Sequence, residues 1–137
     1  MAIVYRTELL EAALAKLCNG LSNVQGAVIV SIEGFVVAAY TPPGQTADNP
    51  EDDPVNSPQV AAMAATLIAL GERTLARLAQ GDLGRMLLEG SDGAMLVVPA
   101  SRRAAVALMV NSDAKMGLSL YALRQTAKDV RSILEGE

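Results

Sequence analysis

The sequence predicts an α+β domain whose elements follow the order helix, strand, strand, helix, strand, strand, strand, helix. Three observations predict it: two apolar runs meet at a turn within residues 26–39, three more apolar runs follow one another over residues 85–110, and helical periodicity marks residues 7–19, 58–80 and 113–134. A chain of 137 residues can bury most of its apolar surface in one core, so we expect a single domain spanning residues 1–137.

Residues 7–19 are expected to form the first helix. Thr7 offers a hydroxyl that can cap the amino-terminal end, and Asn19-Gly20 can end the helix because both residues tolerate the left-handed conformation. Leucines spaced by three and four residues give this helix one apolar side, made by Leu10, Leu14 and Leu17.

The segment GAVIVSIEGFVVAA, residues 26–39, is expected to form a hairpin that turns at Glu33-Gly34. Gly34 can adopt a positive φ without steric cost, and the flanking Val, Ile and Phe residues suit a buried, pleated surface. The first strand, about residues 27–32, is apolar at nearly every position. We therefore expect both of its faces to be covered.

Residues 41–57, TPPGQTADNPEDDPVNS, contain four prolines and an acidic cluster, and we expect them to form a flexible loop. A calcium loop needs alternating oxygen ligands and a closing Glu at a fixed offset, and this segment lacks that pattern. No metal site is therefore predicted for its acidic residues, Asp48, Glu51, Asp52 and Asp53.

Residues 58–80 are expected to form the second helix, with Ser57 as its cap and Pro58 in its first position. No charge occurs from Gln59 to Gly71, and the helix is apolar around almost its whole circumference. Such a helix is buried on more than one side, whereas the sheet of one small domain can cover only one. We therefore expect a second copy of the chain to cover the other side, through Val60, Met63, Leu67 and Leu70.

A three-stranded meander is expected over residues 85–110, with turns at 91–93 and 100–103. The strands at 94–99 and 104–110 are almost wholly apolar and should be central, whereas the strand at 85–89 has a charge at each end and should be an edge. An open apolar edge promotes aggregation, so we expect this strand to pair with the same strand of a second copy. The residues expected at that junction are Arg85, Met86, Leu87 and Leu88.

The last helix is expected to begin at Ser112 or Asp113 and to continue to about Leu134. Gly117 lowers helix stability by about 1 kcal/mol relative to Ala, so we expect it to mark a close approach of another backbone. Apolar residues at helical spacing predict the side that faces the core: Met116, Leu120, Leu123, Ala127, Val130 and Leu134.

Composition excludes several classes of function. The chain has no His and one Cys, so His-based catalytic groups, His-ligated metal sites and cysteine zinc sites are excluded, and Cys18 is expected to be a buried apolar residue. A net charge of −4 and an aromatic content of 3% argue against nucleic-acid binding.

The longest strongly apolar stretch, residues 60–70, is about half of the ~20 residues that a membrane helix needs. No signal peptide is visible in the sequence MAIVYRTELL. We expect a cytoplasmic protein without membrane insertion, without cofactor or metal, and without a catalytic site.

Four segments of the chain resemble the Roadblock / dynein light chain family, and within it the bacterial type that regulates a gliding-motility Ras-like GTPase. They are GAVIVSIEGFVVA at 26–38, AAMAATLIALGERTLARL at 61–78, GRMLLEGSDGAMLVVPA at 84–100 and DAKMGLSLYALRQTAKDV at 113–130. The resemblance implies a five-stranded antiparallel sheet with the second helix on one face and the two terminal helices on the other. It also implies a homodimer joined through the third strand and the second helix.

The leading hypothesis for function is a homodimeric regulator or scaffold that binds a Ras-like small GTPase, as the resemblance implies. The residues on the polar strip of the second helix are candidate partner contacts, although a simple solvated helix face is the competing interpretation: Thr66, Arg73 and Arg77. No residue is assigned as a catalytic arginine. Two alternatives stay open, a structural adaptor in a motor or signalling complex and a module that senses a small ligand, for which Ser31 is the main polar strand residue.

Overall fold

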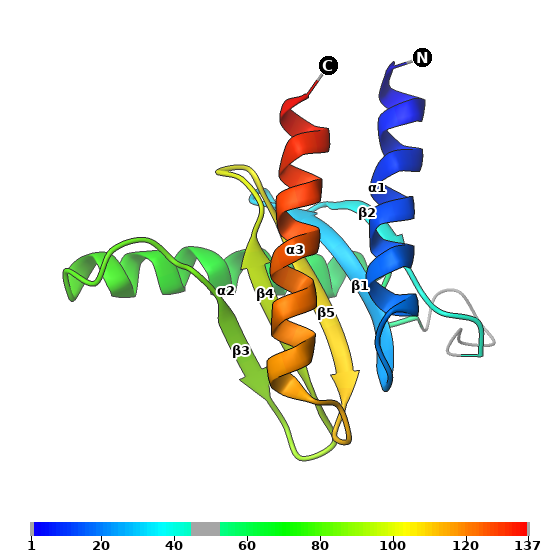
Figure 1. Cartoon of the computed structure of the whole chain (residues 1–137). Helices are drawn as coiled ribbons and strands as arrows, with labels where there is room; N and C mark the ends of the chain where they lie inside the picture. The colour runs from blue at the N-terminus through cyan, green and yellow to red at the C-terminus, as the bar shows by residue number, and fades with distance from the viewer. Residues whose placement is uncertain (1, 45–52, 137) are drawn as a thin grey trace.

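The structure is a computed structural model that describes residues 2–44 and 53–136, and it confirms the predicted order of elements (Figure 1). The elements are α1 (Ala2–Asn19), β1 (Val24–Ser31), β2 (Val36–Tyr40), α2 (Pro58–Arg77), β3 (Met86–Glu89), β4 (Gly93–Pro99), β5 (Ala104–Asn111) and α3 (Met116–Glu135).

The five strands form one antiparallel sheet, as predicted, and their order in the sheet is β2-β1-β5-β4-β3. β5 lies at the centre and pairs on one side with β1, from Val24 paired with Val110 to Ser31 paired with Ala104, and on the other side with β4. Every residue from Ala104 to Val110 is buried, which explains why the sequence of β5 is apolar throughout. The two edges of the sheet are β2 and β3.

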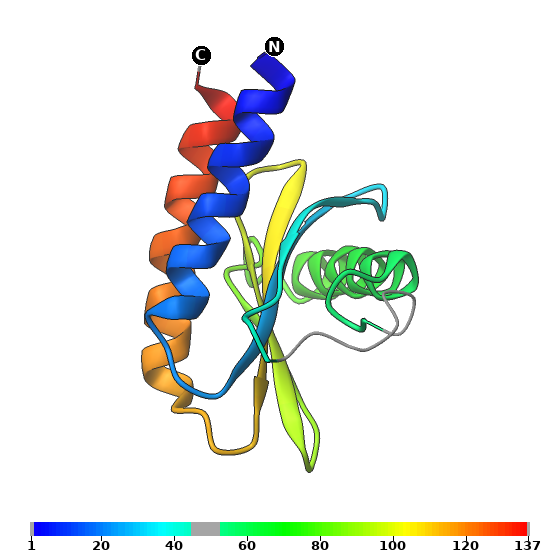
Figure 2. The ribbon, with the colours of Figure 1, turned by 90° about the vertical axis from the view of Figure 1, so that its right-hand side faces the viewer.

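The helices cover both faces of the sheet. Figure 2 shows α1 and α3 side by side on one face, and α2, seen end-on, on the other. Successive residues of a strand point to opposite faces, so β1 contributes Ala27 and Ile29 to the core beneath α1 and α3 and Val28 and Val30 to the core beneath α2. This double burial confirms the expectation that β1 is covered on both sides.

α2 approaches the sheet through small side chains. Its three fully buried residues are Ala61, Ala64 and Ala65, all in its first half. Ser57 caps the helix as predicted, since its hydroxyl accepts the amide hydrogen of Val60 at 3.2 Å. The second half of α2 extends beyond the β3 edge of the sheet (Figure 1), so most of its side chains remain exposed.

Helix boundaries differ from the prediction at three places. α1 begins at Ala2, so Thr7 lies inside the helix and is not its cap. α2 ends at Arg77, three residues before Gln80. α3 begins at Met116 because residues 111–114 form a turn, in which the Asn111 side-chain oxygen accepts the amide hydrogen of Asp113 at 3.1 Å.

The described ends of the 41–57 segment are anchored to the domain. The Asp53 carboxylate accepts hydrogen bonds from the Thr41 hydroxyl at 3.3 Å and from the Val55 amide at 3.0 Å. Val55 is only 2% exposed and packs against Gly26, where an added Cβ would lie 2.7 Å from Val55 Cγ2. The acidic residues Asp48, Glu51 and Asp52 lie outside the described residues.

α1 and α3 run antiparallel, so the start of α1 and the end of α3 lie beyond the same end of the sheet (Figure 1). Their contact is formed by residues far apart in sequence, because Leu10 and Leu14 of α1 share one core cluster with Leu123 and Val130 of α3. The first and last helices of the chain therefore pack together as one layer.

Candidate interaction surface

Apolar side chains predicted to lie between two copies are exposed on α2 and β3. Met63 and Leu70 of α2 are 58% and 53% exposed, and Leu87 and Leu88 of β3 are 52% and 54% exposed. Leu88 points to the α2 face of the sheet and Leu87 to the opposite face, and we call the four side chains together with the β3 edge the α2–β3 surface. Complete burial of a large apolar side chain is worth about 1.5–3 kcal/mol, and covering the exposed half of each of these four is worth roughly half of that, so this surface favours association.

Most of the other residues predicted for this junction are already half-buried within the chain itself. Val60 and Met86 are half-buried against the core beneath α2, and Leu67 is half-buried as well. Arg85 is exposed and directly precedes β3. Contact between α2 and the start of β3 is direct, because a Cβ added at Gly71 would lie 3.9 Å from the sulfur of Met86.

The two edges of the sheet differ in how well they are protected. The pairing of β2 with β1 shifts register between Ile29 and Val30, so Val37 is left as an extra residue in β2. A bulge of this kind twists an edge and hinders pairing with another strand. β3 pairs with β4 in unbroken register from Met86 to Glu89, which leaves a regular outer edge with two exposed leucines.

The predicted partner-contact residues lie on the outer side of α2. Thr66, Arg73 and Arg77 are all exposed, and their spacing of seven and four residues puts them on one side of the helix. The Thr66 hydroxyl donates to the carbonyl of Ala62 at 2.9 Å. Within residues 2–44 and 53–136, neither arginine forms an ion pair, so both guanidinium groups are open to a partner.

Sequence reasoning missed an exposed apolar tip on the β1–β2 hairpin. The predicted turn at Glu33-Gly34 is confirmed, with φ at Gly34 of 97°. At this turn Ile32 and Phe35 are 52% and 69% exposed, although apolar residues of their type suggested burial. The tip rests on α2, because a Cβ added at Gly34 would lie 3.2 Å from Cα of Ala62.

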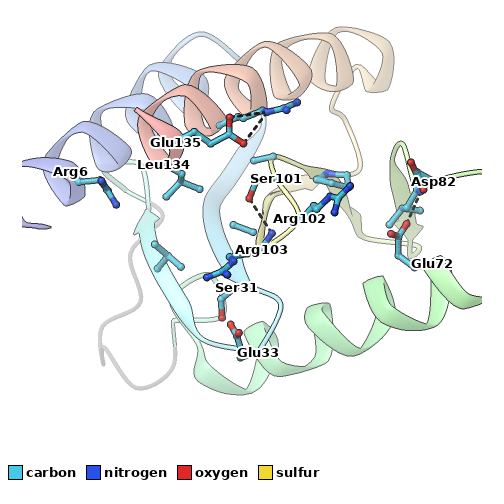
Figure 3. A pocket seen from close by; sticks show the side chains of 16 residues that line it. Arg6, Ser31, Glu33, Glu72, Asp82, Ser101, Arg102, Arg103, Leu134 and Glu135 are labelled. Carbon is cyan, nitrogen blue, oxygen red and sulfur yellow. Dashed lines mark hydrogen bonds and ion pairs between the residues drawn. The ribbon is translucent and has the colours of Figure 1, made fainter. Parts of the chain in front are cut away.

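A cavity of about 1060 Å³ lies at the end of the sheet where the β1–β2 and β4–β5 turns meet (Figure 3). The amide of Ile32 donates to the carbonyl of Arg103 at 2.9 Å and joins these turns. Charges of both signs line the cavity: Arg6, Arg102, Arg103, Arg131, Glu33, Glu72, Asp82 and Glu135.

This cavity lacks the features of a small-ligand site. Ser31 accepts the amide hydrogen of Phe35 at 3.1 Å, and Glu72 accepts that of Leu83 at 2.6 Å, so both side chains stabilise local structure. Among the described residues, the buried polar side chains are Ser119 and Thr126, and neither lines the cavity. A specific pocket would instead present a few enclosed polar groups among apolar ones.

Cys18 is buried as predicted, with 3% of its surface exposed. Burial raises the pKa of its thiol to about 12, so the thiol stays protonated at neutral pH and is a poor nucleophile. In the parts of the chain that the structure describes, no three His, Cys, Asp or Glu side chains cluster as metal ligands would. No described helix is long and apolar enough to cross a membrane.

Similar proteins identify the family of this chain. Residues 10–110 match the Roadblock/LC7 domain. The proteins MJ1340 and MJ0310 of Methanocaldococcus jannaschii are 27% and 30% identical to it over 117 and 105 residues, which cover 84% and 77% of this chain and 91% and 81% of theirs.

Solved structures share the fold at lower sequence identity. The gliding protein MglB from Thermus thermophilus superposes with a TM-score of 0.82 at 17% identity, covering 95% of this chain and 91% of MglB. A Roadblock/LC7 domain from Streptomyces avermitilis gives 0.78 at 20% identity, covering 92% and 98%. With the family match over most of the sequence and this common fold, the chain belongs to the Roadblock/LC7 domain family.

Proposed function

We propose that this chain forms a homodimer that regulates or scaffolds a Ras-like small GTPase. Three findings support the proposal: the chain belongs to the Roadblock/LC7 family, its sequence resembles the bacterial type that regulates a gliding-motility GTPase, and its fold matches that of gliding protein MglB. A composite surface built from two copies suits a protein that binds a partner and carries no catalytic group of its own.

The observation that carries the proposal is the regular β3 edge next to exposed apolar side chains of α2. Two β3 strands related by a two-fold axis would pair antiparallel and join two five-stranded sheets into one. The same contact would shield Leu87 and Leu88 and bring the two α2 helices, with Met63 and Leu70, towards each other. The bulged β2 edge offers no comparable partner, which favours one mode of pairing.

Such a dimer would present two copies of the outer strip of α2 on one surface. Arg73 and Arg77 supply guanidinium groups that can form paired hydrogen bonds with carboxylates of a GTPase, and Thr66 adds a hydroxyl. We assign no arginine to the GTPase active site. Regulation in this proposal comes from holding the GTPase in one nucleotide-dependent conformation.

The test measures mass and GTPase binding together. Light scattering behind a sizing column should give twice the monomer mass of 14.3 kDa for the wild type. Leu87→Lys/Leu88→Lys should give the monomer, because the charges oppose burial at a β3–β3 junction. Ile32→Lys/Phe35→Lys is the matched control, since it changes two apolar residues at the hairpin tip that are at least as exposed overall, at 52% and 69%, and it should remain dimeric.

Binding is then measured against Ras-like GTPases encoded in the same genome, loaded with GDP or a GTP analogue. We expect the dimer to bind one nucleotide state more tightly, and Arg73→Ala/Arg77→Ala to weaken binding about tenfold, or ~1.4 kcal/mol. The comparison variant Arg102→Ala/Arg103→Ala removes two exposed arginines from the β4–β5 turn. A monomeric wild type, or no binding in either state, would contradict the proposal.

A further inference from the structure

A groove separate from the cavity described above lies on the opposite face of the sheet from α2, between α3 and β4. Its volume is about 440 Å³, and its lining comes from the end of β4 and one side of α3. The floor includes Val98, which is 6% exposed, and the wall includes Tyr121, which is 64% exposed. The groove therefore combines a buried apolar floor with an accessible aromatic ring.

The charges that line this groove are all positive. Arg124, Lys128 and Arg131 lie on one side of α3, spaced by four and three residues, and no carboxylate is among the lining residues. The whole chain has 15 acidic and 11 basic residues, so this cluster opposes the net charge of −4. The groove is thus a local positive site on an acidic protein.

These cations are available to a partner. Over the described residues, Arg124 and Lys128 form no ion pair. Arg131 approaches Glu135 at 3.2 Å, but both side chains are more than half exposed, and such a pair contributes little. The pair therefore does not prevent Arg131 from turning towards a bound carboxylate.

We propose that this groove binds an acidic amphipathic helix of a partner protein. An α-helix rises 1.5 Å per residue, so carboxylates spaced by four and three residues on the partner would match the three cations of α3. Apolar residues on the same side of that helix would contact Tyr121 and Val98. Arginine and tyrosine are among the residues that contribute most to protein interfaces.

Charge and shape favour a peptide over other anions. A nucleic acid would need a longer positive surface than one row of three cations, because its affinity depends on the number of phosphates neutralised. A membrane surface is broad, whereas these cations line a concave groove with an apolar floor. The proposal concerns α3 and β4 and does not depend on GTPase binding by α2.

The probe is a fluorescein-labelled helical peptide of about 18 residues, long enough to be helical, with Glu spaced to match α3 and Leu between. The reference peptide carries Lys in place of Glu. Fluorescence anisotropy should detect binding of the Glu peptide alone, and about 0.5 M salt should weaken it. The variant Arg124→Glu/Lys128→Glu should lower affinity at least about tenfold.

The control variant Lys16→Glu/Lys115→Glu makes the same change in net charge at exposed lysines outside the groove and should bind like the wild type. Circular dichroism checks that both variants are folded. Equal binding of the two peptides, or equal losses in the two variants, would overturn the proposal. Tighter, groove-dependent binding to phosphatidylserine vesicles or duplex DNA than to the Glu peptide would also overturn it.

Discussion

Cys18 is a residue whose ionisation is linked to folding. Its side chain shares the core with Leu14, Leu17 and other residues of α1, and burial raises the pKa of its thiol from 9.0 to about 12. The folded state therefore keeps the proton over a range of pH in which the unfolded state loses it. The stability that this provides is complete below pH 9 and is lost as pH rises towards 12.

The free energy of unfolding of the wild type should accordingly fall with rising pH above 9 more steeply than that of Cys18→Ala. The difference in slope should approach about 1.4 kcal/mol per pH unit. Urea unfolding between pH 7 and about 10.5 under reducing conditions measures it. Parallel pH dependences for the two proteins would show that the thiol does not titrate on unfolding.

Single residues show both the reach and the limit of sequence reasoning. The leucines around Cys18 correctly predict its burial, because neighbours at helical spacing share one environment. The prediction that Gly117 lies against another backbone is wrong: this residue is exposed, and an added Cβ would meet nothing within 4 Å. After α1 the left-handed residue is Asn23, with φ of 64°, rather than Gly20.

At the scale of elements, α2 begins with a side-chain cap and has few fully buried residues. Its fully buried residues are three alanines in the first half, and Val60 and Ile68 are only half-buried, so limited packing compensates for a weakened start. Ser57 has the extended backbone of a cap, with φ of −116° and ψ of 121°, and accepts the amide hydrogen of Val60.

Replacement of Ser57 by Ala should therefore lower the free energy of unfolding by about 1 kcal/mol. Ser112→Ala, at an exposed position in the turn before α3, should change it by less than about 0.5 kcal/mol. Chemical denaturation of both variants provides the comparison. Similar small effects at the two sites would mean that the Ser57 hydrogen bond adds no net stability.

Element order can be predicted because periodicity and turn residues are local properties of the chain. Helix starts are predicted less well, since α1 extends back to Ala2, before Thr7, and the turn at Asn111 delays α3 to Met116. The charged ends of the 85–89 segment correctly indicate an edge strand, since charges are tolerated where water remains.

At the scale of the whole molecule, the helix layers protect the two sheet edges unequally. α1 packs over β2, with Ala38 and Tyr40 in its core cluster, whereas Leu87 of β3 stays exposed on the same face. The groove between α3 and the end of β4 lies on this same face of the sheet. Sequence could not predict it, because Val98 and Tyr121 are far apart in the chain and meet only through the fold.

If the dimer proposed above is the folded species, thermal stability should depend on protein concentration. Each tenfold increase should add about 1.4 kcal/mol per dimer and raise Tm by about 3 °C. Differential scanning calorimetry over a hundredfold range measures this shift. The Leu87→Lys/Leu88→Lys variant should have a lower Tm that does not depend on concentration, and a constant wild-type Tm would contradict a folded dimer that unfolds to separate chains.

The antiparallel arrangement of α1 and α3 has a practical consequence for handling the protein. Because the start of α1 and the end of α3 lie beyond the same end of the sheet (Figure 1), a tag, fluorophore or surface linker attached at either end starts from one pole of the molecule. The β3 edge lies away from that pole. Immobilisation through either terminus should thus leave the β3 edge facing the solution.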